Sequence, residues 1–166
     1  MKLNLLKLNQ DKTELIIFAP QHRLQEFTGC QLEFYGSLVN DACCVKNLGV
    51  FFDKTLNMEK QGSSLAKSCF FQIRNIGRIR PHISNDACKT LVSALVTSRL
   101  DYGNFLLYGV NTSLITKLQR IQNTAARLIT RTKRREHITP ILMDLHWIPV
   151  CYRTQYKLLL YMYSKL

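Results

Sequence analysis

Acidic residues are scarce in the second part of this 166-residue sequence. Residues 1–60 hold seven basic and seven acidic side chains, whereas residues 61–166 hold sixteen basic and only four acidic ones. The whole net charge of +12 therefore belongs to the second part, as the difference between sixteen and four. Such an excess of one sign favours a polyanionic partner, nucleic acid first and an anionic membrane surface second.

Long apolar runs and paired cysteine motifs are also missing. No run approaches the roughly 18–20 apolar residues of a membrane-spanning helix, and residues 1–8 are too short for the apolar core of a secretory signal. Six cysteines are present without any Cys-x-x-Cys, which argues against a disulfide framework and a zinc knuckle. We expect reduced thiols, mostly in the core of an intracellular protein, nuclear or cytoplasmic, with no membrane span.

The sequence lacks the groups of residues that most catalytic sites require. It has no Asp-Asp or Asp-x-Asp pair, and two-metal nucleotidyl transfer needs neighbouring carboxylates to hold Mg²⁺. Its glycines are isolated, so no phosphate-binding loop is predicted. Its four histidines have no metal-ligand spacing and are interpreted as structural. Nothing favours a Ser-His-Asp or Cys-His arrangement, and we expect no metal site, no cofactor and no enzyme activity in this chain as it stands.

Three short β-type runs occupy the first part of the chain. They are TELIIFA (residues 13–19), QLEFY (residues 31–35) and VKNLGVFFD (residues 45–53), the last with Gly49 at an expected bulge or close backbone approach. Residues 3–8 fit either a short helix or a strand. Because three short strands seldom cover two apolar faces, we expect this part to lean on the helices or on protein missing from the chain.

From residue 57 onward the apolar spacing is helical. Helices are predicted over residues 57–81, 84–102, 111–131, 137–147 and 152–163, with N-caps at Ser84 and Asn111. The predicted fold class is therefore α+β. A small antiparallel β part (residues 1–55) precedes a mainly α-helical bundle of about five helices (residues 56–166).

Several apolar rows are assigned to the core of the bundle. They are Leu65, Cys69, Ile73 and Ile76; Ala87, Leu91, Val92 and Leu95; and Tyr152, Tyr156, Leu159 and Tyr163. The tyrosine row has an alternative interpretation as a base-stacking platform, as does the lone Trp147. We favour core packing for both, because aromatic rows at helical spacing are usually buried.

The predicted helix over residues 111–131 combines an apolar row with a cationic one. The apolar row comprises Leu114, Leu118, Ile121, Ala125 and Leu128. The cationic row comprises Lys117, Arg120, Thr124, Arg127 and Arg131, and it is followed by Lys133, Arg134 and Arg135. A second, mostly cationic row lies on the first predicted helix at Lys67, Phe71, Arg74 and Arg78. A solvated outer face would explain the cationic row of the 111–131 helix, but no acid occurs between Asp101 and Glu136, which favours a phosphate-facing surface there.

Five segments, in order along the chain, resemble the downstream part of reverse transcriptases from non-LTR (LINE-type, jockey-like) retrotransposons. They are LKLNQDKTELIIF (residues 6–18), VKNLGVFFD (45–53), RNIGRIRPHIS (74–84), LVTSRLDYGNFLLYG (95–109) and LQRIQNTAARLITRTKRREHITPILMDLHWIPVCYR (118–153). Together they span almost the whole chain in the order of the family. The resemblance implies that residues 1–55 are the end of the palm and that residues 56–166 are the thumb.

The resemblance also implies roles for particular residues. Lys12, in the Leu-Asn-x-x-Lys-Thr segment, matches the lysine proposed to protonate the leaving pyrophosphate in this RNA-directed DNA polymerase family. Leu48, Gly49 and Val50 match the hairpin that grips the primer end. The thumb would hold the template–primer by its phosphates. That work suits the cations of the 111–131 helix and of the residues that follow it.

The chain departs from the family pattern at its start. The aspartates that bind Mg²⁺ in the complete enzyme, and the fingers, precede the segment that matches Lys12. The resemblance therefore implies a truncated polymerase fragment that keeps nucleic-acid binding and has the missing palm and fingers as a further potential partner. Gly62 and Gly77, within predicted helices, are interpreted as signs of a decaying copy. The alternative is a helical interaction module whose basic face binds a protein partner or an anionic membrane without catalysis.

Overall fold

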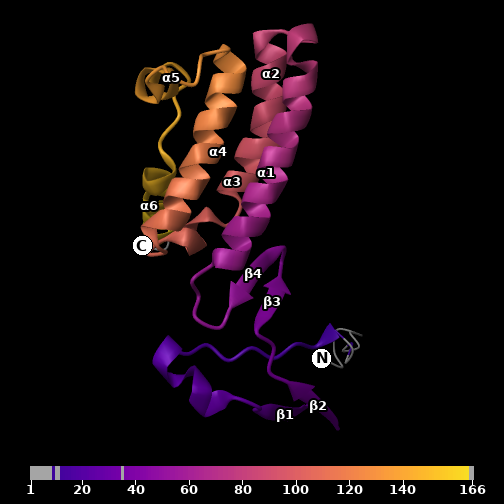
Figure 1. The fold of residues 1–166 in the computed structure, drawn as a ribbon. Coiled ribbons are helices and arrows are strands. Elements are labelled where there is room, and N and C mark those ends of the chain that lie inside the picture. Colours follow the sequence, from indigo (N-terminus) through magenta and orange to yellow (C-terminus); the bar gives the residue numbers. More distant parts are fainter. Residues whose placement is uncertain (1–8, 10–11, 35, 165–166) are drawn as a thin grey trace. The chain divides into compact units, whose positions relative to one another are not determined.

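The computed structural model describes residue 9, residues 12–34 and residues 36–164 of the chain. It divides into two compact units, Met1–Met58 and Glu59–Leu166, where the sequence places the boundary after residue 55 (Figure 1). The first unit contains two small antiparallel sheets and the second contains the α-helices. The predicted α+β class, with a small β part followed by a helical bundle, is confirmed.

The first unit contains two β-hairpins. Strand β1 (Gln31–Phe34) pairs with β2 (Ser37–Asn40), and β3 (Cys44–Asn47) pairs with β4 (Val50–Asp53). The predicted strand over residues 31–35 is thus present as β1, with Tyr35 outside the described residues. Its partner β2 was not predicted. This strand has only four residues, and they alternate between half-buried and exposed.

The run VKNLGVFFD is a hairpin, so the prediction of one strand with a bulge is wrong. The chain reverses at Leu48 and Gly49, where both residues have positive φ angles of 47° and 84°. Two positive φ angles in a two-residue loop are the geometry that matches the twist of paired strands. Asn47 and Val50 then face each other across the ladder. The hairpin that the family resemblance implies at this position is therefore present.

Residues 13–19 do not form the predicted strand. Their backbone groups bond to scattered partners: the Leu15 carbonyl accepts from Ala42 N at 2.8 Å, and Ala19 N donates to the Lys54 carbonyl at 3.1 Å. A single parallel bridge joins Leu15 to Asp41. Without a continuous partner strand, the segment stays extended but isolated. The helix or strand predicted over residues 3–8 lies outside the described residues, as does Leu8 of the Leu-Asn-x-x-Lys-Thr segment.

Asp41 organises the polar interior of the first unit. Its side chain is almost fully buried and accepts a charge-assisted hydrogen bond from Lys54 Nζ. The hydrogen bond to Asp41 raises the pKa of Lys54. The other carboxylate oxygen accepts from Ile17 N at 3.4 Å. Asp41 therefore ties the extended segment to the chain after β4.

The second unit contains six α-helices in the part of the chain that the structure describes. Their bounds are α1 (Glu59–Ile79), α2 (Asn85–Val92), α3 (Ser98–Asp101), α4 (Thr112–Thr130), α5 (Ile138–Asp144) and α6 (Val150–Tyr163). A π-helical segment, Ser93–Thr97, joins α2 to α3 without a break, so five continuous helical rods result. Helix α4 is central, because it packs against α1, α2, α5 and α6 (Figure 1).

In the α2–α3 rod the predicted core residue Val92 is confirmed, whereas the rest of the core row is shifted by one residue from its prediction. The buried side chains are Cys88, Val92, Val96 and Leu100, whereas Ala87 is exposed and Leu91 and Leu95 are half-buried. A repeat of four residues drifts around a regular α-helix, because each step of four turns about 400°. The π-helical segment, with its wider turn, counteracts that drift. The repeat therefore stays on one side of the rod.

The predicted apolar row of α4 is confirmed. Leu114, Leu118, Ile121 and Ala125 are buried and Leu128 is half-buried. The predicted caps are confirmed as well: Asn111 Oδ1 accepts from Ser113 N at 2.9 Å. Ser84 Oγ likewise accepts from Ala87 N at 3.2 Å at the start of α2.

The tyrosine row of α6 is exposed, so its assignment to the core is wrong. Tyr152, Tyr156, Leu159 and Tyr163 lie on the outside, while Val150 and Thr154 are the buried side chains of this helix. Two glutamine side chains of α4 set this orientation by hydrogen bonds to the backbone at the start of α6. Gln119 Oε1 accepts from Val150 N at 2.8 Å, and Gln122 Nε2 donates to the Ile148 carbonyl at 2.9 Å.

Trp147 packs as the sequence interpretation favoured. It lies against a small apolar cluster built by α4 and α5, whose buried members are Ala126, Ile141 and Leu142. This cluster fixes α5 on the side of the C-terminal half of α4.

Gly62 has a role in helix packing, so its presence within a helix is not evidence for a decaying copy. A Cβ on Gly62 would lie 2.1 Å from Leu114 Cδ1 and 3.1 Å from Leu114 Cγ. Because Leu114 is buried, its side chain has little room to yield. Glycine thus permits the close approach of α1 to α4. Gly77 differs, since a Cβ there would meet its nearest atom, on Leu128, at an ordinary 3.9 Å.

These two glycines predict opposite effects of the same substitution. Gly62→Ala should lower the free energy of unfolding by about 1–3 kcal/mol through overpacking. Gly77→Ala should raise it by about 1 kcal/mol, because alanine is the better helix former. Urea unfolding followed by the helical circular dichroism signal measures both. A Gly62→Ala protein as stable as the wild type would contradict the close approach.

Candidate nucleic-acid interface

Helices α1 and α4 lie side by side (Figure 1). Both helices carry exposed cations. Lys117 Nζ on α4 donates to Ser63 Oγ on α1 at 3.1 Å. Ser63 lies one turn before the exposed Lys67, so both face the same side of α1. The cationic rows of the two helices are therefore neighbours in space, although about fifty residues separate them in sequence.

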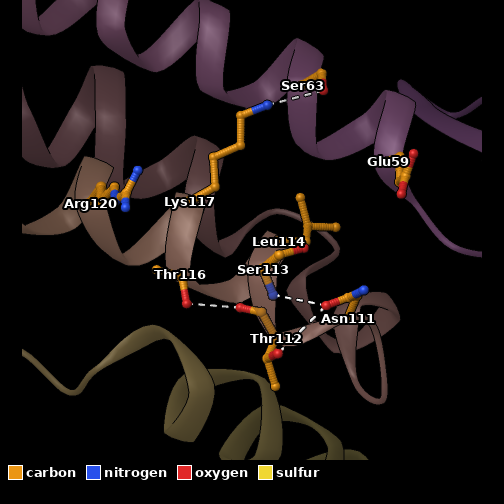
Figure 2. Close-up of a pocket in the computed structure, with 9 residues that line it drawn as sticks. All are labelled: Glu59, Ser63, Asn111, Thr112, Ser113, Leu114, Thr116, Lys117 and Arg120. Atoms are coloured by element: carbon orange, nitrogen blue, oxygen red, sulfur yellow. Dashed lines mark hydrogen bonds between the residues drawn. The ribbon is translucent and has the colours of Figure 1, made fainter.

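A groove of about 670 Å³ lies at the surface beside the starts of α1 and α4. Figure 2 shows that Lys117 crosses it toward Ser63, with Arg120 one turn further along α4. The Arg120 guanidinium makes no hydrogen bond or ion pair with the described residues. The groove also has hydroxyl groups from Thr112 and Thr116. Exposed ammonium, guanidinium and hydroxyl donors are the groups that contact backbone phosphates.

The exposed side of α1 extends this cationic surface. Lys67, Arg74 and Arg78 are exposed at spacings of seven and four residues, with Phe71 between the first two. Arg99 on α3 donates to Ser68 Oγ and brings a further cation to the edge of α1. The sequence showed the α1 row without assigning it a function. It gave no signal for Arg99, since its partner is 31 residues away.

We define the basic face as Lys67, Arg74, Arg78, Lys117 and Arg120. Few carboxylates oppose it within the described part of the second unit. Glu59 lines the groove at the start of α1, whereas Asp101 is paired with Arg153 at 2.7 Å. Glu136 Oε1 accepts from Lys133 N at 3.2 Å in the loop after α4. The positive charge of the basic face is therefore largely uncompensated.

Arg127 and Arg131, which the sequence assigned to phosphates, already donate to the protein. Arg127 donates to the Glu136 carbonyl at 2.7 Å and to the Lys133 carbonyl at 3.4 Å, which fixes the basic loop. Arg131, with a φ of 57° at the end of α4, donates to the Arg80 carbonyl at 3.2 Å. Their phosphate contacts stay a prediction, but both guanidinium groups have a structural role.

The loop after α4 displays the remaining predicted cations. Lys133, Arg134 and Arg135 are exposed in a tight turn that closes with Glu136 N donating to the Lys133 carbonyl at 3.2 Å. These side chains lie beyond the C-terminal end of α4, whereas Lys117 and Arg120 lie in its N-terminal half. The structure therefore divides the predicted set into the basic face and a separate basic loop, residues 131–135.

Arg80 is a buried cation that the sequence did not single out. It is 5% exposed and its guanidinium donates to the carbonyls of Leu128 (2.9 Å) and Ile129 (2.8 Å) in the last turn of α4. It also donates to the Ile83 carbonyl at 3.0 Å and to Asn85 Oδ1. The last carbonyls of a helix lack partners within it. Arg80 supplies those partners for α4 and links them to the α1–α2 connection.

The predicted residues of the first unit lie at its surface or in its second hairpin. Lys12 is exposed and lines a groove of about 450 Å³ that Glu14 and Lys46 also line. Leu48 and Gly49 form the β3–β4 turn and Val50 begins β4 as a buried residue. The structure brings no predicted catalytic partner to Lys12 among the described residues.

Two carboxylates of the first unit are engaged by internal hydrogen bonds. Asp41 is occupied by Lys54 and Ile17 N, and Asp53 Oδ1 accepts from Asn57 N at 2.8 Å. No group of three or more His, Cys, Asp or Glu side chains among the described residues is placed to hold a metal ion. No described helix combines the length and apolarity needed to cross a membrane.

The six cysteines are free thiols, but only Cys69 and Cys88 are buried. Burial raises the pKa of Cys69 to about 11, and burial also raises the pKa of Cys88. These two thiols are core side chains, as predicted. Cys43 is exposed, and Cys30, Cys44 and Cys151 are half-buried, so the core assignment is wrong for most of the set.

Comparisons of this chain with protein-family models, with curated proteins and with solved structures find no match.

The two classes of arginine predict different effects on stability. Arg80→Met should lower the free energy of unfolding by about 2–4 kcal/mol, because buried carbonyls lose their donors. Arg120→Met removes the same charge from an exposed site and should change it by less than about 0.5 kcal/mol. Thermal and urea unfolding of both variants measure the difference. Equal effects of the two substitutions would contradict the structural assignment of Arg80.

Proposed function

We propose that residues 59–166 bind nucleic acid by phosphate contacts on the basic face. One observation carries the proposal: exposed cations of α1 and α4 adjoin across the Lys117–Ser63 hydrogen bond. Cations on a continuous surface release counterions from a phosphate backbone, which supplies most sequence-independent affinity. The basic loop, residues 131–135, adds exposed charge beyond the end of α4.

The proposed partner is a template–primer held through its backbone. Hybrid and RNA duplexes are recognised mainly by their shape and their phosphates, since their major groove is too narrow for side chains to read. The basic face offers long Lys and Arg side chains that are exposed at the surface. Binding should therefore show little preference for sequence.

We further propose, from the family resemblance, that the chain is the palm end and thumb of a non-LTR reverse transcriptase. This proposal assigns no polymerase chemistry to the chain, because its sequence has no Asp-Asp or Asp-x-Asp pair to hold Mg²⁺. The β3–β4 turn would face the primer end, and Lys12 would need the remainder of the palm to act. The missing palm and fingers are thus proposed partners, in an intracellular setting.

The salt dependence of binding tests the phosphate contacts. On duplex DNA, log K should fall linearly with log salt, with a slope near −0.9 for each phosphate contact. Replacing both Lys117 and Arg120 by Gln removes two proposed contacts, so the slope should become shallower by about 1.8. Fluorescence anisotropy of a labelled duplex across a salt series measures this slope. Lys157→Gln on α6 is the matched control and should leave the slope unchanged.

Other outcomes would favour the alternative class of function. An unchanged slope in the double variant would refute phosphate contact by Lys117 and Arg120. Binding to anionic vesicles without binding to duplex DNA would instead support a membrane-directed interaction module.

A further inference from the structure

A second groove on α1 combines an exposed aromatic ring with cations. It has a volume of about 630 Å³ and is lined by Ser64, Lys67, Ser68, Phe70, Phe71 and Arg74. Phe71 is 57% exposed, although it belongs to a helix whose opposite side is well packed. Phe70 is less exposed, at 37%, and forms another wall. The size is within the range of about 300–1,000 Å³ that is typical of small-ligand sites.

The position of Phe71 between two cations is set by helix geometry. Lys67 lies four residues before it and Arg74 three residues after it, so all three project from the same side of α1. Their Cα atoms span about 10 Å along the axis, at 1.5 Å per residue. Arg99 holds Ser68 Oγ at the edge of the groove and adds positive charge there. Cations that could contact phosphates therefore lie on both sides of the Phe71 ring along α1.

We propose that this groove binds an unpaired base of single-stranded nucleic acid, with the base stacked on Phe71. Lys67 and Arg74 contact the phosphates on either side of that nucleotide. The inference rests on the proposed function and extends it from backbone contact to base contact. In a duplex the faces of the bases are covered by their neighbours, so a ring on the protein surface stacks only on an unstacked base.

The tyrosine row of α6 is the competing aromatic surface, and it lacks this arrangement. Tyr156 has nearly the same exposure as Phe71, at 58%. Its neighbour Arg153 is already paired with Asp101 at 2.7 Å, and Lys157 is half-buried. Among the described residues, Phe71 has unpaired cations on both sides along α1. This arrangement favours α1 over α6 as the stacking site.

A strand without bases keeps its phosphates but cannot stack on the protein. It therefore distinguishes base stacking from phosphate contact. Fluorescence anisotropy compares a labelled oligothymidylate with an abasic strand of the same length, using the full chain. The wild type should bind the thymidylate strand about tenfold more tightly, because stacking of one base contributes roughly 1–3 kcal/mol. Phe71→Ala should remove that difference and leave the abasic affinity unchanged. Phe71→Trp should restore it, and Tyr156→Ala should retain it.

The other outcomes are distinct. Equal weakening of both strands by Phe71→Ala, or no effect on either, overturns the stacking inference while salt-dependent binding still supports the phosphate contacts. Loss of the base-dependent part in Tyr156→Ala moves the stacking site to α6 and also overturns the inference. Failure of the wild type to bind either strand overturns the inference, and failure to bind duplex DNA as well, at any salt concentration, contradicts the proposed function itself.

Discussion

The helical unit depends on how the end of α4 is hydrogen-bonded. Arg80 inserts a guanidinium group that donates to the carbonyls of Leu128 and Ile129, at a site where water has little access. Unpaired carbonyls there would cost about 1–3 kcal/mol each. No carboxylate of the residues that the structure describes pairs with this buried cation, so its charge is stabilised by backbone dipoles at the negative end of α4. The α1–α2 connection and α4 are thereby joined at one point.

The contact of Arg80 with the end of α4 also affects the outer surface of α1 and α4. It fixes the C-terminal end of α4 beside the end of α1, while Gly62 permits Leu114 to pack closely at the other end. The two helices therefore run together along their length, and their outward residues form one surface. On that surface Lys117 donates to the Ser63 hydroxyl, whereas Arg80, Arg127 and Arg131 donate to backbone carbonyls of the protein.

Much of the fold was predictable because helical periodicity is a local property. The apolar row of α4 and the caps at Ser84 and Asn111 followed from residue spacing and cap chemistry alone. Contacts between distant residues were not predictable. The π-helical segment keeps the buried repeat of α2 and α3 on one side of the rod, and the hydrogen bonds of Gln119 and Gln122 turn the α6 tyrosines outward.

The candidate site was predictable only in part, for the same reason. A sequence shows which residues are cationic, but not which of them face a carbonyl of their own protein. Arg120 and Arg127 occupy one row at a spacing of seven residues, yet Arg127 closes a loop, whereas the Arg120 side chain has no hydrogen-bond or ion-pair partner among the described residues. The hairpin at Leu48 and Gly49 needed the family resemblance, because a leucine at positive φ is an unusual turn residue.

The most direct test of the central claim is to locate the nucleic acid on the protein. Acetylation of surface lysines, read by mass spectrometry with and without a bound oligonucleotide, reports which ammonium groups become covered. The account predicts that Lys67 on α1 and Lys117 on α4 are protected together, while Lys157 on α6 reacts at the same rate in both states. Protection of Lys157, with Lys67 and Lys117 unchanged, would contradict it.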